Sequence, residues 1–132
     1  MGELLTASLA RASGTALTTV TDKNITSLTI TRGDWDIYYS VNYAGTATAT
    51  SYLAGWVSTT DATDPGANQN CLTRVAGTAV LPVNTIDTML VGMPFRISLS
   101  SDTLYYLSVN ATFSGGGNTC KGSGTIYARR VR

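Results

Sequence analysis

The chain has 132 residues, a formal net charge of +1 and 13% charged residues, which leaves little electrostatic attraction toward nucleic acid, membranes or acidic substrates. It contains no His, so nucleophilic catalysis with an imidazole base is excluded, and Thr and Ser make up roughly a quarter of the residues. This composition favours a single β domain that is not an enzyme and that contacts its partners through shape and apolar surface.

Residues 1–15 have no regular pattern. Leu4, Leu5 and Leu9 would share part of a helix face, but Gly14 then interrupts it. We expect an N-terminal arm or a short strand here, with Leu4 and Leu5 available to bind a partner. The segment lacks the basic and apolar regions of a signal peptide, and no later segment approaches the ~20 apolar residues of a membrane span. The sequence therefore predicts a protein made in the cytoplasm.

The clearest strand covers residues 34–43. Its odd-numbered residues are apolar or aromatic and its even-numbered residues are mostly polar, an alternation that is typical of a strand with one buried face. The residues expected in the core are Trp35, Ile37, Tyr39, Val41 and Tyr43. Asp34 and Asp36 would share the other face, where a solvated surface is a better explanation than a pair of catalytic acids or a calcium site.

Further strands are expected over 17–21, 25–31, 46–58, 71–80, 85–91, 95–99, 103–113 and 119–131. Turn-forming residues separate them, including a turn-rich segment over 59–70 and a glycine-rich turn over 114–118. About eight strands without a convincing helix predict an all-β fold for residues 16–132. We expect a two-sheet antiparallel sandwich, with a jelly roll as the favoured topology.

Three aromatic residues are candidates for contact with a partner. Tyr38 shares the polar face of the strand over 34–43, and Tyr52 and Trp56 are expected to share a threonine-rich face of the strand over 46–58. Exposed Tyr and Trp on a sheet serve as contact hot spots or as platforms on which sugars stack. The alternative is that a second sheet or the N-terminal segment covers them.

Two cysteines, Cys71 and Cys120, cannot form a zinc site, because the chain has no His and no CxxC spacing to complete a set of four ligands. For a protein made in the cytoplasm, two buried free thiols are the default interpretation. The alternative is a disulfide that closes a loop of about 50 residues after release into an oxidising exterior. No cofactor, metal ion or catalytic residue is expected elsewhere in the chain.

The sequence ends in a cluster of positive charge formed by Arg129, Arg130 and Arg132. If these residues extend the last strand, Arg129 and Arg130 point to opposite faces of the sheet, which is unlike a nucleic-acid-binding patch. Arginine forms bidentate hydrogen bonds with carboxylates and tolerates burial at interfaces better than lysine does. We therefore expect these three residues to anchor the chain to a protein partner.

Three parts of the sequence carry a set of short motifs. They are Asn24-Ile25-Thr26-Ser27-Leu28-Thr29-Ile30 with Gly33-Asp34-Trp35-Asp36-Ile37, then Leu53-Ala54-Gly55-Trp56-Val57-Ser58-Thr59-Thr60, and finally Arg96-Ile97-Ser98-Leu99, Leu104-Tyr105-Tyr106-Leu107, Ala111-Thr112-Phe113 and Ile126-Tyr127-Ala128-Arg129-Arg130-Val131-Arg132. Together they resemble a family of small structural proteins from the virions of tailed bacteriophages. The resemblance spans most of the chain and implies a non-enzymatic, jelly-roll-like β-sandwich module.

Within this family, the resemblance implies either a capsid decoration (cement) protein or the tip of a tail fibre. The domain begins close to Met1, with no stalk or coiled-coil segment before it, which favours the decoration protein. Such a protein would bind the major capsid protein across subunit junctions on the capsid exterior, as a homo-oligomer (dimer or trimer), and would stabilise the head. The alternative is a receptor- or glycan-binding module of the phage tail. No nucleic acid or membrane partner is expected.

Overall fold

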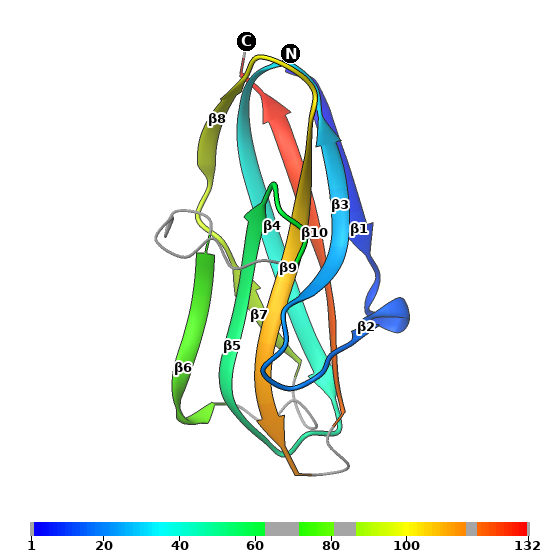
Figure 1. The fold of residues 1–132 in the computed structure, drawn as a ribbon, viewed down its shortest axis with the longest axis vertical. Coiled ribbons are helices and arrows are strands. Elements are labelled where there is room, and N and C mark those ends of the chain that lie inside the picture. The colour runs from blue at the N-terminus through cyan, green and yellow to red at the C-terminus, as the bar shows by residue number, and fades with distance from the viewer. Residues whose placement is uncertain (1, 63–71, 81–86, 116–118, 132) are drawn as a thin grey trace.

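In the computed structural model, which describes residues 2–62, 72–80, 87–115 and 119–131, the chain forms two β-sheets packed face to face (Figure 1). The six-stranded sheet, named sheet A, contains β1 (Leu4–Leu9), β2 (Thr15–Ala16), β4 (Gly33–Gly45), β7 (Thr88–Val91), β8 (Phe95–Leu99) and β10 (Cys120–Arg130). The four-stranded sheet, named sheet B, contains β3 (Lys23–Ile30), β5 (Ala49–Ser58), β6 (Leu72–Val80) and β9 (Thr103–Ser114). A 3-10 turn, Arg11–Ser13, follows β1.

The strand order is that of a jelly roll. Sheet A has the order β1-β10-β4-β7, with β2 also beside β10 and β8 also beside β4, and sheet B has the order β3-β9-β5-β6. Neighbouring strands are antiparallel throughout the described residues. Because β1 and β2 share one edge position and β7 and β8 share the other, the ten strands fill eight positions, which confirms the predicted fold class.

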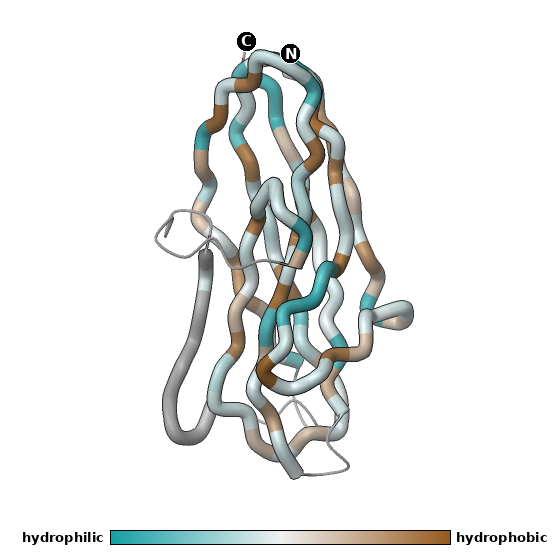
Figure 2. The backbone as a smooth tube through the Cα atoms, in the orientation of Figure 1, coloured by the Kyte–Doolittle hydropathy of each residue, from teal (hydrophilic) through white to brown (hydrophobic). Residues whose placement is uncertain are grey.

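The core between the sheets consists of the alternate residues that the sequence predicts. The odd-numbered residues of β4, Trp35, Ile37, Tyr39, Val41 and Tyr43, are at most 2% exposed, so the predicted orientation of this strand is confirmed. Residues of sheet B join the same cluster from the opposite side: Leu53, Val57, Leu107 and Val109. Figure 2 shows the alternation, in which hydrophobic positions recur along the strands between polar ones. Within the described residues, no helix is long and apolar enough to cross a membrane.

Two tyrosines of β4 link the sheets by hydrogen bonds across the core. The Tyr39 hydroxyl lies 3.3 Å from the carbonyl oxygen of Gly55 and 2.9 Å from Oγ1 of Thr73. The Tyr43 hydroxyl donates to the carbonyl of Ala54. Burial raises the pKa of Tyr43 well above its ordinary value, so its hydroxyl keeps the proton that it donates. These bonds fix β4 against β5.

The absence of a side chain at Gly55 lets β5 approach β4 closely. A Cβ at this residue would lie 2.6 Å from Cγ2 and 3.1 Å from Cγ1 of Val41, which is closer than buried carbon atoms pack. Val41 is fully buried, so its side chain has no solvent to move into. The contact between Gly55 and Val41 therefore sets the spacing of the two sheets at this point.

Residues 17–21, expected as a strand, instead carry the chain from sheet A to sheet B. The amide of Leu17 donates to the carbonyl of Cys120 in β10 at 2.9 Å, and the amide of Val20 donates to the carbonyl of Ala111 in β9 at 2.8 Å. Val20 has a φ of 61°, in the left-handed region. The prediction of a strand here is wrong, because alternation of polar and apolar residues does not reveal where the backbone turns between layers.

β5 begins at Ala49 instead of residue 46, and a bulge interrupts its pairing with β9 between Thr50 and Tyr52. Thr50 lies opposite the core residue Phe113, whereas Tyr52 lies opposite the preceding residue of β9. Thr50 and Tyr52 therefore point to opposite sides of sheet B, and the prediction that Tyr52 and Trp56 share a face with Thr50 is wrong. The extra residue of a bulge reverses the alternation of side chains along a strand.

Cys120, the first residue of β10, is buried, and this burial raises the pKa of its thiol to about 11. We expect the Cys120 thiol of a Cys71→Ser variant to resist a disulfide reagent at mildly alkaline pH, because the reactive thiolate is almost absent below that pKa. The same variant unfolded in guanidinium should react fully. Rapid labelling of the folded variant would contradict the buried position. Cys71 lies outside the described residues, so the choice between two free thiols, the default interpretation, and a bridge stays open.

Candidate functional site

The outer face of sheet A, which points away from the core, is rich in exposed apolar side chains. Four of the eight exposed large apolar residues in the described chain lie on this face: Leu4 of β1, Met89 and Val91 of β7, and Tyr127 of β10. A fifth, Met93, is 80% exposed in the connection between β7 and β8. Exposed apolar surface gathered on one face of a domain marks a site of contact with another molecule.

The registers of the strands arrange the outer face of sheet A in rows. One row consists of Ser8, Thr125, Ser40 and Val91, and the next consists of Thr6, Tyr127 and Tyr38. We name these two rows the central rows, and none of their residues is charged. The row that follows consists of Leu4, Arg129, Asp36 and Arg96, and there the charges begin.

Tyr38 and Tyr127 stack on each other within the central rows. They lie directly opposite each other on β4 and β10, with ring centroids 4.8 Å apart and 4° between the ring planes. A stacked pair of this kind adds about 0.5–1.5 kcal/mol beyond the burial of its surface. Tyr127 nevertheless remains 38% exposed, so the pair still presents aromatic surface to a partner.

Ion pairs flank the central rows on both sides. Arg96 binds Asp36 through two hydrogen bonds, of 2.8 Å from Nε and 3.2 Å from Nη2, and these bonds hold the pKa of Asp36 below its ordinary value. Arg11 binds Asp87 through Nε and, at 2.9 Å, through Nη2, and likewise lowers the pKa of Asp87. Because Arg11 follows β1 and Asp87 precedes β7, this second pair connects the two edges of the sheet.

Two hollows lie on either side of Arg11. One has a volume of about 420 Å³ and is lined partly by hydroxyl and amide side chains, among them Ser40, Asn42 and Thr125. The other has a volume of about 520 Å³ and is lined by Arg11 and Lys121 together with threonine and serine hydroxyls. Both hollows offer hydrogen-bond donors and acceptors; in the first the charge of Arg11 is balanced by Asp87, whereas the second is lined by two cations.

The fold brings together three of the residues that the sequence predicts as contact residues. Leu4 lies directly opposite Arg129, and Tyr38 lies in the neighbouring row of the outer face of sheet A. Leu5 has the opposite orientation and packs against the core, because alternate residues of a strand point to opposite sides. The sequence analysis missed Tyr127, although it shares the parity of Arg129 in the last strand.

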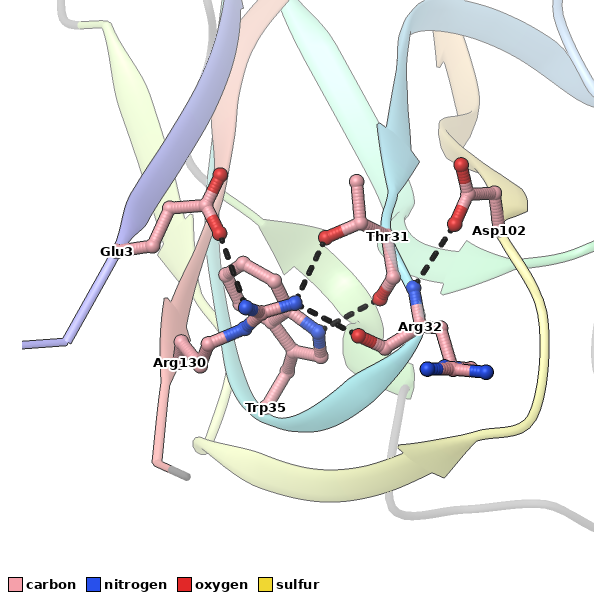
Figure 3. A network of polar contacts seen from close by, with 6 residues as sticks. All are labelled: Glu3, Thr31, Arg32, Trp35, Asp102 and Arg130. Atoms are coloured by element: carbon pink, nitrogen blue, oxygen red, sulfur yellow. Dashed lines mark hydrogen bonds and ion pairs between the residues drawn. The ribbon is translucent and has the colours of Figure 1, made fainter.

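Arg130 points away from the outer face of sheet A and closes one end of the sandwich (Figure 3). Its guanidinium lies over the Trp35 ring, 4.9 Å from the centroid, and Nη2 donates to Oγ1 of Thr31 at 3.1 Å and to the carbonyl of Arg32 at 2.7 Å. Nη1 lies 3.5 Å from a carboxylate oxygen of Glu3. The predicted opposite orientations of Arg129 and Arg130 are thus found, and Arg130 binds within its own chain.

We expect Arg130→Ala to lower the free energy of unfolding by about 1–3 kcal/mol, because it removes a cation–π contact and two hydrogen bonds from a partly buried site. Arg130→Lys should recover only part of this loss, since an ammonium group cannot stack and form both bonds. Urea unfolding measures the change, and the neighbouring Arg129→Ala serves as the control, with an effect within about 0.5 kcal/mol. Equal effects of the two alanine variants would contradict the structural role of Arg130.

Tyr52 and Trp56 lie on sheet B, apart from the outer face of sheet A. Trp56 is opposite Ser108 and is 0% exposed, so its ring is not available to stack on a sugar or to contact a partner. Other parts of the chain cover this ring. Tyr52 is half-buried. Arg132 lies outside the described residues.

Asp34 and Asp36 do not form a free pair of acids. Asp36 is held by Arg96, and Asp34 accepts a hydrogen bond of 2.6 Å from the Ser98 hydroxyl. Among the residues that the structure describes, no three His, Cys, Asp or Glu side chains are grouped so that they could hold a metal ion. This part of the chain offers a surface for contact instead of an arranged acid and base.

Comparison with known proteins places the fold among viral particle proteins. No family model matches the sequence, and no curated protein is similar to it. Similar solved structures are the VP2 subviral particle of infectious bursal disease virus (TM-score 0.59, 13% identity), the Gx strain of that virus (0.57, 15%) and T=1 particles derived from it (0.55, 11%). Each match covers 98% of this chain and 32% of the other, so the chain spans about a third of their length. At these identities the likeness shows the fold.

Proposed function

We propose that this chain is a non-enzymatic structural protein of a virion, and more specifically a capsid decoration protein that binds the major capsid protein on the exterior of the head. The observation that carries the proposal is the match of the complete jelly roll, 98% of the chain, to proteins of viral particles. The motifs that resemble small virion proteins of tailed bacteriophages support the same class. The outer face of sheet A supplies apolar surface for assembly.

A decoration protein needs no chemistry to stabilise a capsid. A protein that binds the assembled shell and not its separated subunits stabilises the shell in proportion to RT ln(1 + [L]/Kd), where [L] is its free concentration. Binding as a dimer or trimer across subunit junctions strengthens this effect, because each further contact is made at high effective concentration. Leu4 and Arg129, which lie side by side at one end of the outer face of sheet A, are proposed contacts.

The test is the number of copies of this chain in purified particles of the virus that encodes it. Quantitative mass spectrometry against the major capsid protein should give a copy number similar to that of the shell protein. A copy number far below that of the shell would contradict decoration and favour a tail protein. Complete absence from particles would overturn the virion role. Adding recombinant chain to particles that lack it should raise their melting temperature.

The second candidate function is a receptor- or glycan-binding module of the phage tail. It is favoured by the hollow of about 420 Å³ on the outer face of sheet A, whose hydroxyl and amide side chains suit a neutral sugar. Jelly rolls also occur in lectins, so the fold permits this function. Binding to a glycan array that is lost in Asn42→Ala, together with a low copy number in particles, would favour it over decoration.

A further inference from the structure

We infer that the outer face of sheet A binds a second copy of this chain through its central rows. This deepens the proposed homo-oligomer by naming its interface, and it rests on that part of the proposed function. The alternative occupants, a glycan or a different protein, fit the face less well for reasons of charge and ring geometry. The surface that touches the capsid then lies outside the central rows, where Leu4 and Arg129 are the proposed contacts.

The first observation is the unequal exposure of the two sheets. On sheet A, Val91 is 65% exposed and Met89 is 62% exposed. On sheet B, the large ring of Trp56 is fully buried, and of the described residues on its outer face only Leu104, at 40%, is a large apolar side chain that is exposed. Among the described side chains, a single copy therefore leaves more large apolar surface uncovered on sheet A than on sheet B, and sheet A is the side where association gains most.

The second observation is the distribution of charge over the face. The central rows contain only hydroxyl, aromatic and apolar side chains, and the charged side chains lie to either side of them. Protein interfaces have this arrangement, with an uncharged centre that contains Tyr and a polar rim. Where two identical surfaces meet around a symmetry axis, the residues nearest the axis meet their own copies, so an uncharged centre avoids repulsion between like charges.

The third observation concerns the charges of the rim. Asp36 is bound by Arg96 and Asp87 is bound by Arg11, so these carboxylates and guanidiniums already have partners within the chain. Arg129, in the same row as Asp36, lies outside these two pairs, so a strongly basic partner would find little unpaired negative charge to recognise here. A second copy carries the same two ion pairs, so these parts of the two rims are electrostatically compatible.

The geometry of the aromatic pair disfavours a sugar as the main occupant. The rings of Tyr38 and Tyr127 are parallel and 4.8 Å apart, so each ring already covers one face of the other. A sugar that stacks has only the second face of each ring available, whereas an interface between proteins uses the edges and hydroxyls of tyrosines as well. The tyrosine pair is therefore better suited to contact with a protein surface.

Sedimentation of the purified full chain at micromolar concentrations tests the inference. The wild-type protein should sediment as a dimer or trimer. Tyr127→Arg and Val91→Arg, which each place a charge in the central rows, should weaken association at least about tenfold, in line with the loss of an interface hot spot. Leu104→Arg is the matched control, because Leu104 is 40% exposed and Tyr127 is 38% exposed, but on opposite sheets.

A monomeric wild-type protein would overturn the inference. So would association that survives both substitutions in sheet A, or that is lost in Leu104→Arg and kept in the other two variants. Circular dichroism and thermal melting of each variant show whether it is folded. If Tyr127→Arg does not fold, the association of Val91→Arg still tests the interface. Copy number in particles is measured separately, so an oligomer absent from virions would overturn the proposed function and leave this inference standing.

Discussion

Ile37→Asp should abolish folding, whereas Ser40→Asp, on the same strand, should leave the fold of each chain intact. Ile37 is 0% exposed and lies between Ala128 of β10 and Phe95 of β8 in the middle of sheet A. A carboxylate buried there without a partner costs several kcal/mol, and the lost apolar contacts add to this cost. A domain of this size has only about 5–15 kcal/mol of stability to lose.

Far-UV circular dichroism and urea unfolding measure the outcome. Ile37→Asp should lack the cooperative transition of the wild-type protein, and Ser40→Asp should keep it. Because Ser40 belongs to the central rows, we also expect Ser40→Asp to weaken self-association without unfolding the chain. A stable Ile37→Asp protein, or an unfolded Ser40→Asp protein, would show that the assigned orientation of β4 is wrong.

Gly55→Ala should destabilise the sandwich by about 2–3 kcal/mol, because the added methyl group would overlap with the side chain of Val41. Val41→Ala should also destabilise it, because deletion of two buried methyl groups leaves a cavity. The double variant should be more stable than the sum of the single effects predicts, since the alanine at residue 41 makes room for the alanine at residue 55. An interaction energy of about 1 kcal/mol or more is expected from the double-mutant cycle.

Guanidinium unfolding of the four proteins provides the cycle. Additive effects would show that the two residues are not in contact, and would contradict the close approach of β5 to β4. Val109→Ala, another deletion in the same core, is the control, because it should not relieve the effect of Gly55→Ala.

The sequence predicts best the side-chain orientations that are set within a single strand. The buried face of β4 follows from the alternation of residues 34–43, and the opposite orientations of Arg129 and Arg130 follow from their being neighbours in a strand. Both properties need only the geometry of an extended backbone. The two-sheet architecture follows from the number of such strands and the lack of a helix.

The parts that could not be predicted depend on which strands meet. Tyr127 and Tyr38 are 89 positions apart in the sequence, and only the register of β10 on β4 places them face to face. Alternation alone places Trp56 on a threonine-rich face, yet its ring is fully buried. The bulge between Thr50 and Tyr52 reverses which side of sheet B the following residues of β5 point to, and no Gly or Pro beside it announces this change. Pairing between distant strands is set by topology, which local alternation does not contain.

β10 joins the two halves of sheet A, yet it follows the nine other described strands in chain order. β1, far earlier in the sequence, pairs with β10, and β4 has its most extensive pairing with the same strand. Pairing between such distant segments has to wait for the closure of long loops. While the chain is being synthesised, β1 and one side of β4 therefore keep open edges until β10 has been made, and only then are the two halves of sheet A joined. A nascent chain that stops before Cys120 would expose those edges to aggregation.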